Sequence, residues 1–153
     1  MKILKRILDI FYISKKKEIV KKVPTMMELP KGAKVWVMNP EELDKNGFDW
    51  FKSILHREND LPAIEYSDGS KEWYKNGKIH RESDLPAIED SDGTKYWYKE
   101  GKLHRENDLP AVEHSSGTKK WYKEGKRHRD NNKPAIIWFD GKKEYWVNGK
   151  RIK

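Results

Sequence analysis

The sequence predicts an all-β repeat array, in which tandem β-hairpin meanders form an extended, twisted antiparallel sheet after a small helical N-terminal segment. A unit of 24 residues begins at His56 and begins again at His80, His104 and His128. Eight of the ten glycines mark two turns in each unit. Only 35% of the residues are hydrophobic, which is too few for a thick core. A fixed period of this size is typical of units that bury their apolar faces against their neighbours.

Residues 1–22 predict a basic amphipathic helix, because apolar side chains recur at steps of three and four residues and charged side chains occupy the other face. We favour a cap on the exposed end of the repeat stack, since terminal units need cover. The alternative is an arm that docks on an anionic membrane surface or on a partner. The apolar face comprises Ile3, Leu4, Ile7, Leu8, Phe11 and Tyr12.

Residues 23–55 lose the period and predict a connector of one short strand and a helix start. The strand is expected at Lys34–Met38. Asn39-Pro40 followed by two glutamates favours a helix start, because it combines a capping side chain with carboxylates near the positive end of the helix dipole. Trp50 lies 24 residues before Tyr74, so residues 49–55 are interpreted as the end of a degenerate leading repeat.

Residues 56–153 hold four repeats, each predicted to be a small three-stranded meander. In the first repeat the strands are expected near Ala63–Ser67, Lys71–Lys75 and Lys78–Arg81. Asp-Gly or Asn-Gly between alternating residues is a strong hairpin signal, because both central positions need positive φ. The turns are Asp68-Gly69, Asp92-Gly93, Ser116-Gly117 and Asp140-Gly141, and then Asn76-Gly77, Glu100-Gly101, Glu124-Gly125 and Asn148-Gly149.

Adjacent aromatic residues in the second strand predict two aromatic columns on opposite faces of the sheet, since neighbouring strand residues point to opposite sides. A proline enters each first strand, where a missing N–H costs least. The structural columns are Trp73, Trp97, Trp121 and Tyr145 on one face, and Tyr74, Tyr98, Tyr122 and Trp146 on the other.

The turn glycine, the Lys-x-Trp-Tyr-x-x-Gly-Lys segment that follows it and the period together resemble the MORN-like repeats over residues 53–153. The resemblance implies β-hairpins stacked into an extended, twisted sheet. The chain departs from the MORN pattern where His56-Arg57 and its copies, followed by Pro-Ala, replace a glycine-rich stretch. It is more similar to the H-R-x-x-x-x-P-A arrays of uncharacterised phage and large-virus proteins, which implies no particular chemistry.

The repeated histidines His56, His80, His104 and His128 are predicted to be structural. They could form a metal ladder with nearby carboxylates, but a residue present in every unit is there for what every unit shares. We expect each histidine to stack on a ring or bond the neighbouring backbone. Each arginine is expected to pair with an acidic residue such as Glu58, Glu82, Glu106 or Asp130.

No nucleophile elbow, phosphate loop or H-E-x-x-H motif occurs in the sequence, and no cysteine is present. We therefore expect neither enzymatic activity nor a cofactor or metal. His114 is the one histidine outside the repeat register, and it is interpreted as polar surface. The chain has no recognisable signal peptide or apolar run long enough to cross a membrane, so we expect a cytoplasmic location.

Two strand positions change from repeat to repeat and are candidates for specificity. Drift at exposed positions explains the changes equally well. The first position carries Tyr66, Asp90, His114 and Trp138, and the second carries Glu72, Tyr96, Lys120 and Glu144.

The net charge of +8 is concentrated at the ends of this basic protein. A second candidate function is therefore nucleic-acid binding, with cations on phosphates and aromatic rings on bases. The basic ends comprise Lys15, Lys16, Lys17, Lys21, Lys22, Arg127, Arg129, Lys142, Lys143 and Arg151.

The favoured function is a non-enzymatic repeat module that binds another protein along its sheet. The aromatic-rich, mixed-charge surface favours a protein partner, because aromatic residues dominate interface energies. The viral resemblance implies a phage-encoded accessory or counter-defence factor that blocks a host protein. Binding of an anionic membrane surface through residues 1–22 is a further alternative, and an open sheet edge permits a homodimer.

Overall fold

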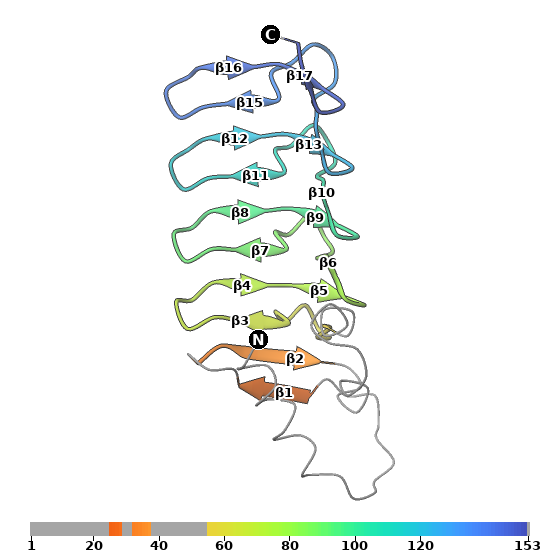
Figure 1. The fold of residues 1–153 in the computed structure, drawn as a ribbon, viewed down its shortest axis with the longest axis vertical. Helices are drawn as coiled ribbons and strands as arrows, with labels where there is room; N and C mark the ends of the chain where they lie inside the picture. Colours follow the sequence, from red (N-terminus) through yellow and green to blue (C-terminus); the bar gives the residue numbers. More distant parts are fainter. Residues whose placement is uncertain (1–24, 29–31, 38–54, 153) are drawn as a thin grey trace, which may run out of the picture.

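The computed structural model describes residues 25–28, 32–37 and 55–152. Every element in these ranges is a β-strand, which confirms the all-β class and the tandem antiparallel hairpins. The helix predicted over residues 1–22 and the helix start at Asn39 lie outside the described ranges. So do residues 49–54 of the segment 49–55, which was predicted to end a degenerate leading repeat. Figure 1 shows an elongated stack in which each repeat lies next to the one before it.

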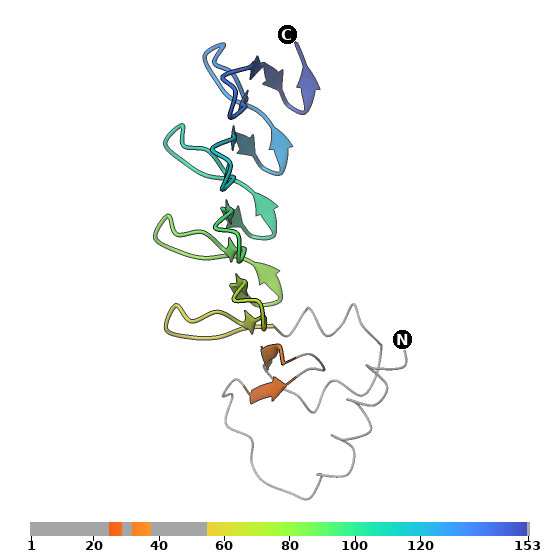
Figure 2. The same cartoon turned by 90° about the vertical axis from the view of Figure 1, so that its left-hand side faces the viewer.

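One ten-stranded antiparallel sheet runs through the described part of the chain, in the order β1-β2-β3-β4-β7-β8-β11-β12-β15-β16. Each repeat adds one hairpin to this sheet. Figure 2 shows the hairpins in the same orientation along the long axis. The strands are β1 (Thr25–Glu28), β2 (Lys34–Val37), β3 (Ile64–Glu65), β4 (Lys71–Glu72), β7 (Ile88–Glu89), β8 (Lys95–Tyr96), β11 (Val112–Glu113), β12 (Lys119–Lys120), β15 (Ile136–Ile137) and β16 (Lys143–Glu144).

A second, smaller hairpin follows in every repeat and lies beside the main sheet. Gly77 N–H donates to the carbonyl of Leu55 at 3.0 Å, and the copies of Gly77 bond to the preceding repeat in the same way. The hairpins consist of β5 (Tyr74–Lys75) with β6 (Lys78–Ile79), β9 (Tyr98–Lys99) with β10 (Lys102–Leu103), β13 (Tyr122–Lys123) with β14 (Lys126–Arg127), and β17 (Trp146–Val147) with β18 (Lys150–Arg151).

The second predicted strand is not continuous, because the chain leaves the main sheet at Trp73. The N–H of Trp73 donates to the Ala87 carbonyl of the next repeat at 2.8 Å, whereas its carbonyl accepts from His80 N–H at 3.0 Å. The prediction of one strand over Lys71–Lys75 is therefore wrong. The two residues before Trp73 belong to the hairpin of the main sheet, and the two residues after it belong to the small hairpin.

The two glycine turns have different backbone conformations. Asn76 and Gly77 have φ of 49° and 75°, as the hairpin signal predicts. At the other turn, Gly69 has φ of 92° and is the one residue of 66–70 with positive φ. An added Cβ at Gly69 would meet no atom within 4 Å, so glycine is required there by φ alone. The prediction of two positive φ values at Asp68-Gly69 is wrong, because this loop has three residues and a glycine bulge.

The core is thin, as the low apolar content predicts, with a column of alanine and tryptophan side chains on one face of the sheet and buried aliphatic side chains on the other. Ala63 and its copies have no exposed surface, and Trp73, Trp97 and Trp121 are 6 to 7% exposed. Ile64, Val112 and Ile136 are buried on the strand position next to the alanine. A larger side chain at the alanine position would overpack this column.

Strand β2 continues the column on the N-terminal side and, together with β1, occupies the position of a leading unit. Trp36 N–H donates to the Ala63 carbonyl at 2.8 Å, as Trp73 does to Ala87. Leu55 pairs with Val37, as Ile79 pairs with Tyr74. Trp36 thus takes the position of Trp73, and Val37 takes the position of Tyr74, where the period alone would place Trp50. The reason is that residues 38–54 are inserted between the pairing partners Val37 and Leu55.

Candidate functional site

A third turn in each repeat, at the H-R-x-x-x loop, holds two consecutive residues at positive φ without glycine. Asn59 and Asp60 have φ of 60° and 55°, and Leu61 N–H donates to the Glu58 carbonyl at 3.3 Å. Asparagine, aspartate and serine fill these two positions in all four repeats. Asparagine and aspartate tolerate this conformation better than other residues that have a Cβ. The Asn-Asp pair is the sequence signal for this turn. The turn was not predicted from the sequence because no glycine accompanies the pair.

This turn joins neighbouring repeats through one arginine. Arg81 lies 3.8 Å above the Trp73 ring and forms two hydrogen bonds of 2.8 Å with the carboxylate of Asp60, which belongs to the preceding repeat. It also donates to the Pro86 carbonyl and to Glu89, both at 3.2 Å. Planar, bidentate contact and stacking on a ring are typical of arginine rather than lysine. Asp84 with Arg105 and Asp108 with Arg129 repeat the ion pair.

The predicted pairing of each repeated arginine with an acidic residue is confirmed, but the partner is not the acidic residue next to it. Glu82 instead forms an ion pair with Lys75 at 2.6 Å. A sequence signal for the true partner exists in the fifth position of each repeat. This position is aspartate in the first three repeats, each of which is followed by a repeat with an arginine partner. In the fourth repeat, which has no such successor within the described residues, the position is Asn132. The signal was missed because it links residues 21 positions apart.

The repeated histidines bond the neighbouring backbone, which is one of the two predicted alternatives. Nδ1 of His80 accepts a hydrogen bond from the backbone N–H of Glu100 at 3.1 Å. His56, His104 and His128 make the same contact to Asn76, Glu124 and Asn148. Because Nδ1 accepts, the neutral ring carries its proton on Nε2, which faces a carboxylate. Each histidine therefore fastens the small hairpin of its own repeat.

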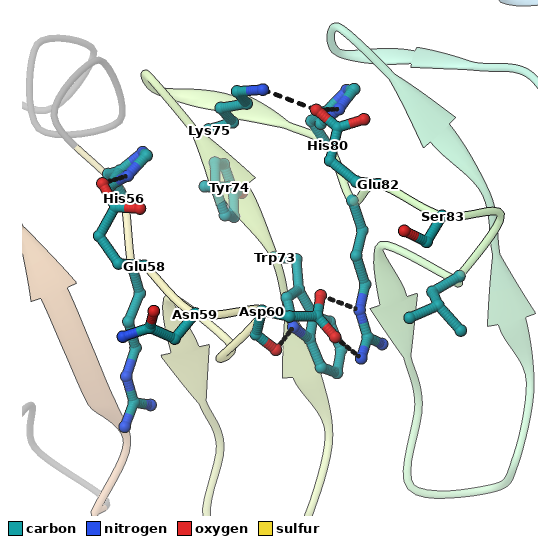
Figure 3. Close-up of a pocket in the computed structure, with 13 residues that line it drawn as sticks. His56, Glu58, Asn59, Asp60, Trp73, Tyr74, Lys75, His80, Glu82 and Ser83 are labelled. Atoms are coloured by element: carbon teal, nitrogen blue, oxygen red, sulfur yellow. Dashed lines mark hydrogen bonds and ion pairs between the residues drawn. The ribbon is translucent and has the colours of Figure 1, made fainter.

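A groove of about 310 Å³ lies between the first two of these loops (Figure 3). Figure 3 shows Lys75 directed to Glu82. Asp60 forms an ion pair with Arg81. The charged side chains of its walls are thus paired with one another. Within residues 25–28, 32–37 and 55–152, no group of three or more His, Asp or Glu side chains is placed to hold a metal ion. The geometry of the groove is that of a joint between repeats.

Asp108 at the last of these joints has a strongly lowered pKa, which makes its contribution testable. Hydrogen bonds from Arg129 and Lys133 lower the pKa of Asp108 to about 2, against an ordinary value of 3.8. A carboxyl group whose pKa is lower in the folded state stabilises the folded state at pH values above its ordinary pKa. This stabilisation is lost as the pH falls through the folded-state pKa.

The variant Asp108→Asn should therefore have a lower melting temperature than the wild type at pH 7. This difference should shrink as the pH falls from about 4 through about 2, because Asp108 of the unfolded wild type takes up its proton near the ordinary pKa and Asp108 of the folded wild type does so only near pH 2. Differential scanning calorimetry of both proteins across this range measures the difference, and the other carboxylates cancel. A difference that stays constant with pH contradicts the assignment.

The variable residues predicted from sequence come together in one row on the opposite face from the tryptophan column. Tyr66 donates to Oε1 of Glu72 at 2.9 Å within the first repeat. Burial and the negative charge of Glu72 raise the pKa of Tyr66. In the second repeat, burial and then a hydrogen bond to Asp90 raise the pKa of Tyr96 to about 12.

The row continues without a gap through the third and fourth repeats. The rings of Tyr96 and His114 meet edge to face with centroids 6.4 Å apart. The Lys120 ammonium lies 5.6 Å from the centre of the Trp138 ring, and Trp138 donates to Glu144 at 3.1 Å. Burial and the charge of Lys120 lower the pKa of His114. All eight variable positions therefore follow one another along the sheet.

The predicted basic ends are only partly described. Lys15, Lys16, Lys17, Lys21 and Lys22 lie outside the described residues. Arg129 is occupied inside the stack by Asp108 and the Trp121 ring. Arg127 lies 4.6 Å above the Trp146 ring, and Arg151 is 3.9 Å from Glu144. Lys142 and Lys143 are exposed.

Comparisons with protein-family models, with curated proteins and with solved structures found no match. The resemblance to MORN-like and viral repeat arrays therefore stays a prediction. Within the described ranges, no helix has the length and apolar content needed to cross a membrane.

Proposed function

We propose that this chain is a non-enzymatic binding module that recognises another protein through the row of eight variable residues. One observation carries the proposal. The two variable strand positions form one contiguous row on one face, with Tyr66 at one end and Glu144 at the other. The repeated arginine and aspartate side chains are engaged in the joints between units, and the repeated histidines are engaged in the small hairpins of their own repeats.

A protein partner fits the row better than a uniform polymer does. The row combines tyrosine and tryptophan rings with both signs of charge, and such a surface favours one partner sequence over another. Continuous β-sheet holds these side chains on a rigid scaffold, which lowers the entropic cost of binding. The resemblance to phage and large-virus arrays supports a factor that binds and blocks a host protein, with residues 1–22 as a helical cap or docking arm.

Site-specific photocrosslinking tests which face meets the partner. We expect benzoylphenylalanine in place of Tyr96, in the variable row, to give a discrete protein adduct in cells that express the chain. The matched control replaces Lys95, the preceding residue of β8 on the opposite face, and should give no such adduct. Mass spectrometry identifies the adducts.

Two outcomes contradict the proposal. Equal adducts from Tyr96 and Lys95 would mean that the faces are not distinguished. Adducts that disappear after nuclease treatment would favour the nucleic-acid alternative, in which the cations contact phosphates. Deleting residues 1–22 tests the membrane alternative separately, because binding to anionic vesicles should then be lost.

A further inference from the structure

The first and fourth repeats each hold a carboxylate between two aromatic donors in the variable row. Glu72 accepts from the Tyr66 hydroxyl at 2.9 Å and from the Tyr74 hydroxyl at 2.8 Å. Glu144 occupies the same strand position in the fourth repeat. Its two oxygens accept from the indole N–H groups of Trp138 and Trp146, both at 3.1 Å. The same strand position thus holds a carboxylate between two aromatic donors in two of the four repeats.

The third repeat has the same strand pairing around this position, but no carboxylate occupies the position. Lys120 stands in the position of Glu72 and pairs with Val112 and Ile136, as Glu72 pairs with Ile64 and Ile88. Asp90 supplies the acidic group of the second repeat, whereas the third has His114 and Lys120 at the two variable positions. It is the one repeat of four with no acidic residue in the row.

The third repeat carries further donors besides Lys120. Arg127 replaces the apolar residue that earlier repeats carry at this position, Ile79 or Leu103. Its Nε lies 3.4 Å from the Tyr122 hydroxyl. No carboxylate pairs with Lys120 or Arg127 within the described part of the chain. Nε2 of His114 has no hydrogen-bond partner there either. Positive charge and donors therefore gather where the neighbouring repeats hold an anion.

We infer that the third repeat receives a carboxylate from outside: an aspartate or glutamate side chain of the partner protein that contacts Lys120, Arg127 and the Tyr122 hydroxyl. This inference rests on the proposed function and names the chemistry of the partner. Hydrogen bonds between a charged donor and a carboxylate are stronger than neutral ones. Lys120, Tyr122 and Arg127 are half-buried, so an incoming side chain reaches them with part of its hydration removed.

A single acidic side chain fits this place better than a nucleic-acid backbone does. Asp90 and Glu144 lie on either side of it in the same row. A chain of phosphates along the row would meet both carboxylates, and like charges brought together at an interface oppose binding. One carboxylate flanked by neutral residues avoids this repulsion and meets the aromatic rings of Tyr96 and Trp138.

The test is a titration of the full chain with N-acetylglutamate methylamide, followed by NMR at the indole N–H groups and the backbone around β12. We expect saturable shifts confined to the third and fourth repeats, and roughly tenfold weaker binding of the matched glutamine compound, which lacks the charge. The variant Lys120→Glu should remove the response, because it restores the resident carboxylate seen in the first and fourth repeats.

The control variant is Lys119→Glu, which changes the net charge equally on the opposite face and should bind within about twofold of the wild type. Equal losses in both variants, or no saturable shift in the wild type, would overturn the inference. If a thymidine oligonucleotide binds more tightly and depends on Lys120 in the same way, the ligand of the third repeat is a phosphate and not a carboxylate of a partner protein. If crosslinking from Tyr96 succeeds while this titration fails, the inference alone falls and the proposed function stands.

Discussion

Replacing Trp97 with alanine is expected to lower the free energy of unfolding by about 3 to 5 kcal/mol, the cost of emptying a buried aromatic site. Trp97 is 6% exposed, and its indole N–H donates to the Asp84 carbonyl at 2.9 Å. The substitution also removes the ring beneath Arg105, which lies 3.8 Å above it. Because each repeat contacts only its neighbours, the damage falls on the joint between the second and third repeats.

Urea unfolding followed by far-ultraviolet circular dichroism measures this loss. The matched control is Tyr98→Ala, which removes the adjacent ring from the opposite face. Tyr98 is half-buried, so its loss should be smaller, about 1 to 2 kcal/mol. Equal losses for the two variants would contradict the assignment of the core to the tryptophan column.

Replacing Arg105 with lysine is expected to lower the free energy of unfolding by about 2 kcal/mol, although the charge is kept. Arg105 makes two hydrogen bonds of 2.9 Å to Asp84 and two further ones to Pro110 and Glu113. A lysine ammonium cannot reach all three acceptors from one position. This loss is smaller than the loss for a fully buried ion pair, because the Asp84 side chain is 46% exposed.

The control for this prediction is Lys102→Gln, which removes a second inter-repeat ion pair. Lys102 and Glu124 are 3.3 Å apart, but both side chains are more than half exposed. Their loss should cost less than about 0.5 kcal/mol. If Arg105→Lys is as mild as Lys102→Gln in urea unfolding, the arginine joint does not hold the stack together.

Local features were predicted well from sequence, because they depend on residues close together in the chain. The hairpin at Asn76-Gly77 and the opposite faces of Trp73 and Tyr74 follow from φ preferences and from the alternation of side chains along a strand. The break at Trp73 was not predictable in this way. It arises from a hydrogen bond to Ala87 of the next repeat, and no local preference of Trp73 encodes it.

The members of the variable row were predicted, but their mutual contacts were not. Comparison of the four repeats identifies Tyr96, His114 and Lys120 as changing positions. Only the stacked hairpins bring Tyr96 from one repeat against His114 of the next. The absence of an acidic residue from the two variable positions of the third repeat gains meaning only once Glu72 and Glu144 are seen to be held by pairs of rings.

The sequence by itself determined the repeat length, the hairpin turns and the side of the sheet on which each residue lies. These follow from backbone preferences that act over a few residues and recur with the period. Only the tertiary structure decided which repeats meet through which residues, as in the pairing of Asp84 with Arg105 and the use of Trp36 in the leading position. Such contacts join residues about 20 or more positions apart, so they depend on how far the chain travels before it returns to the sheet.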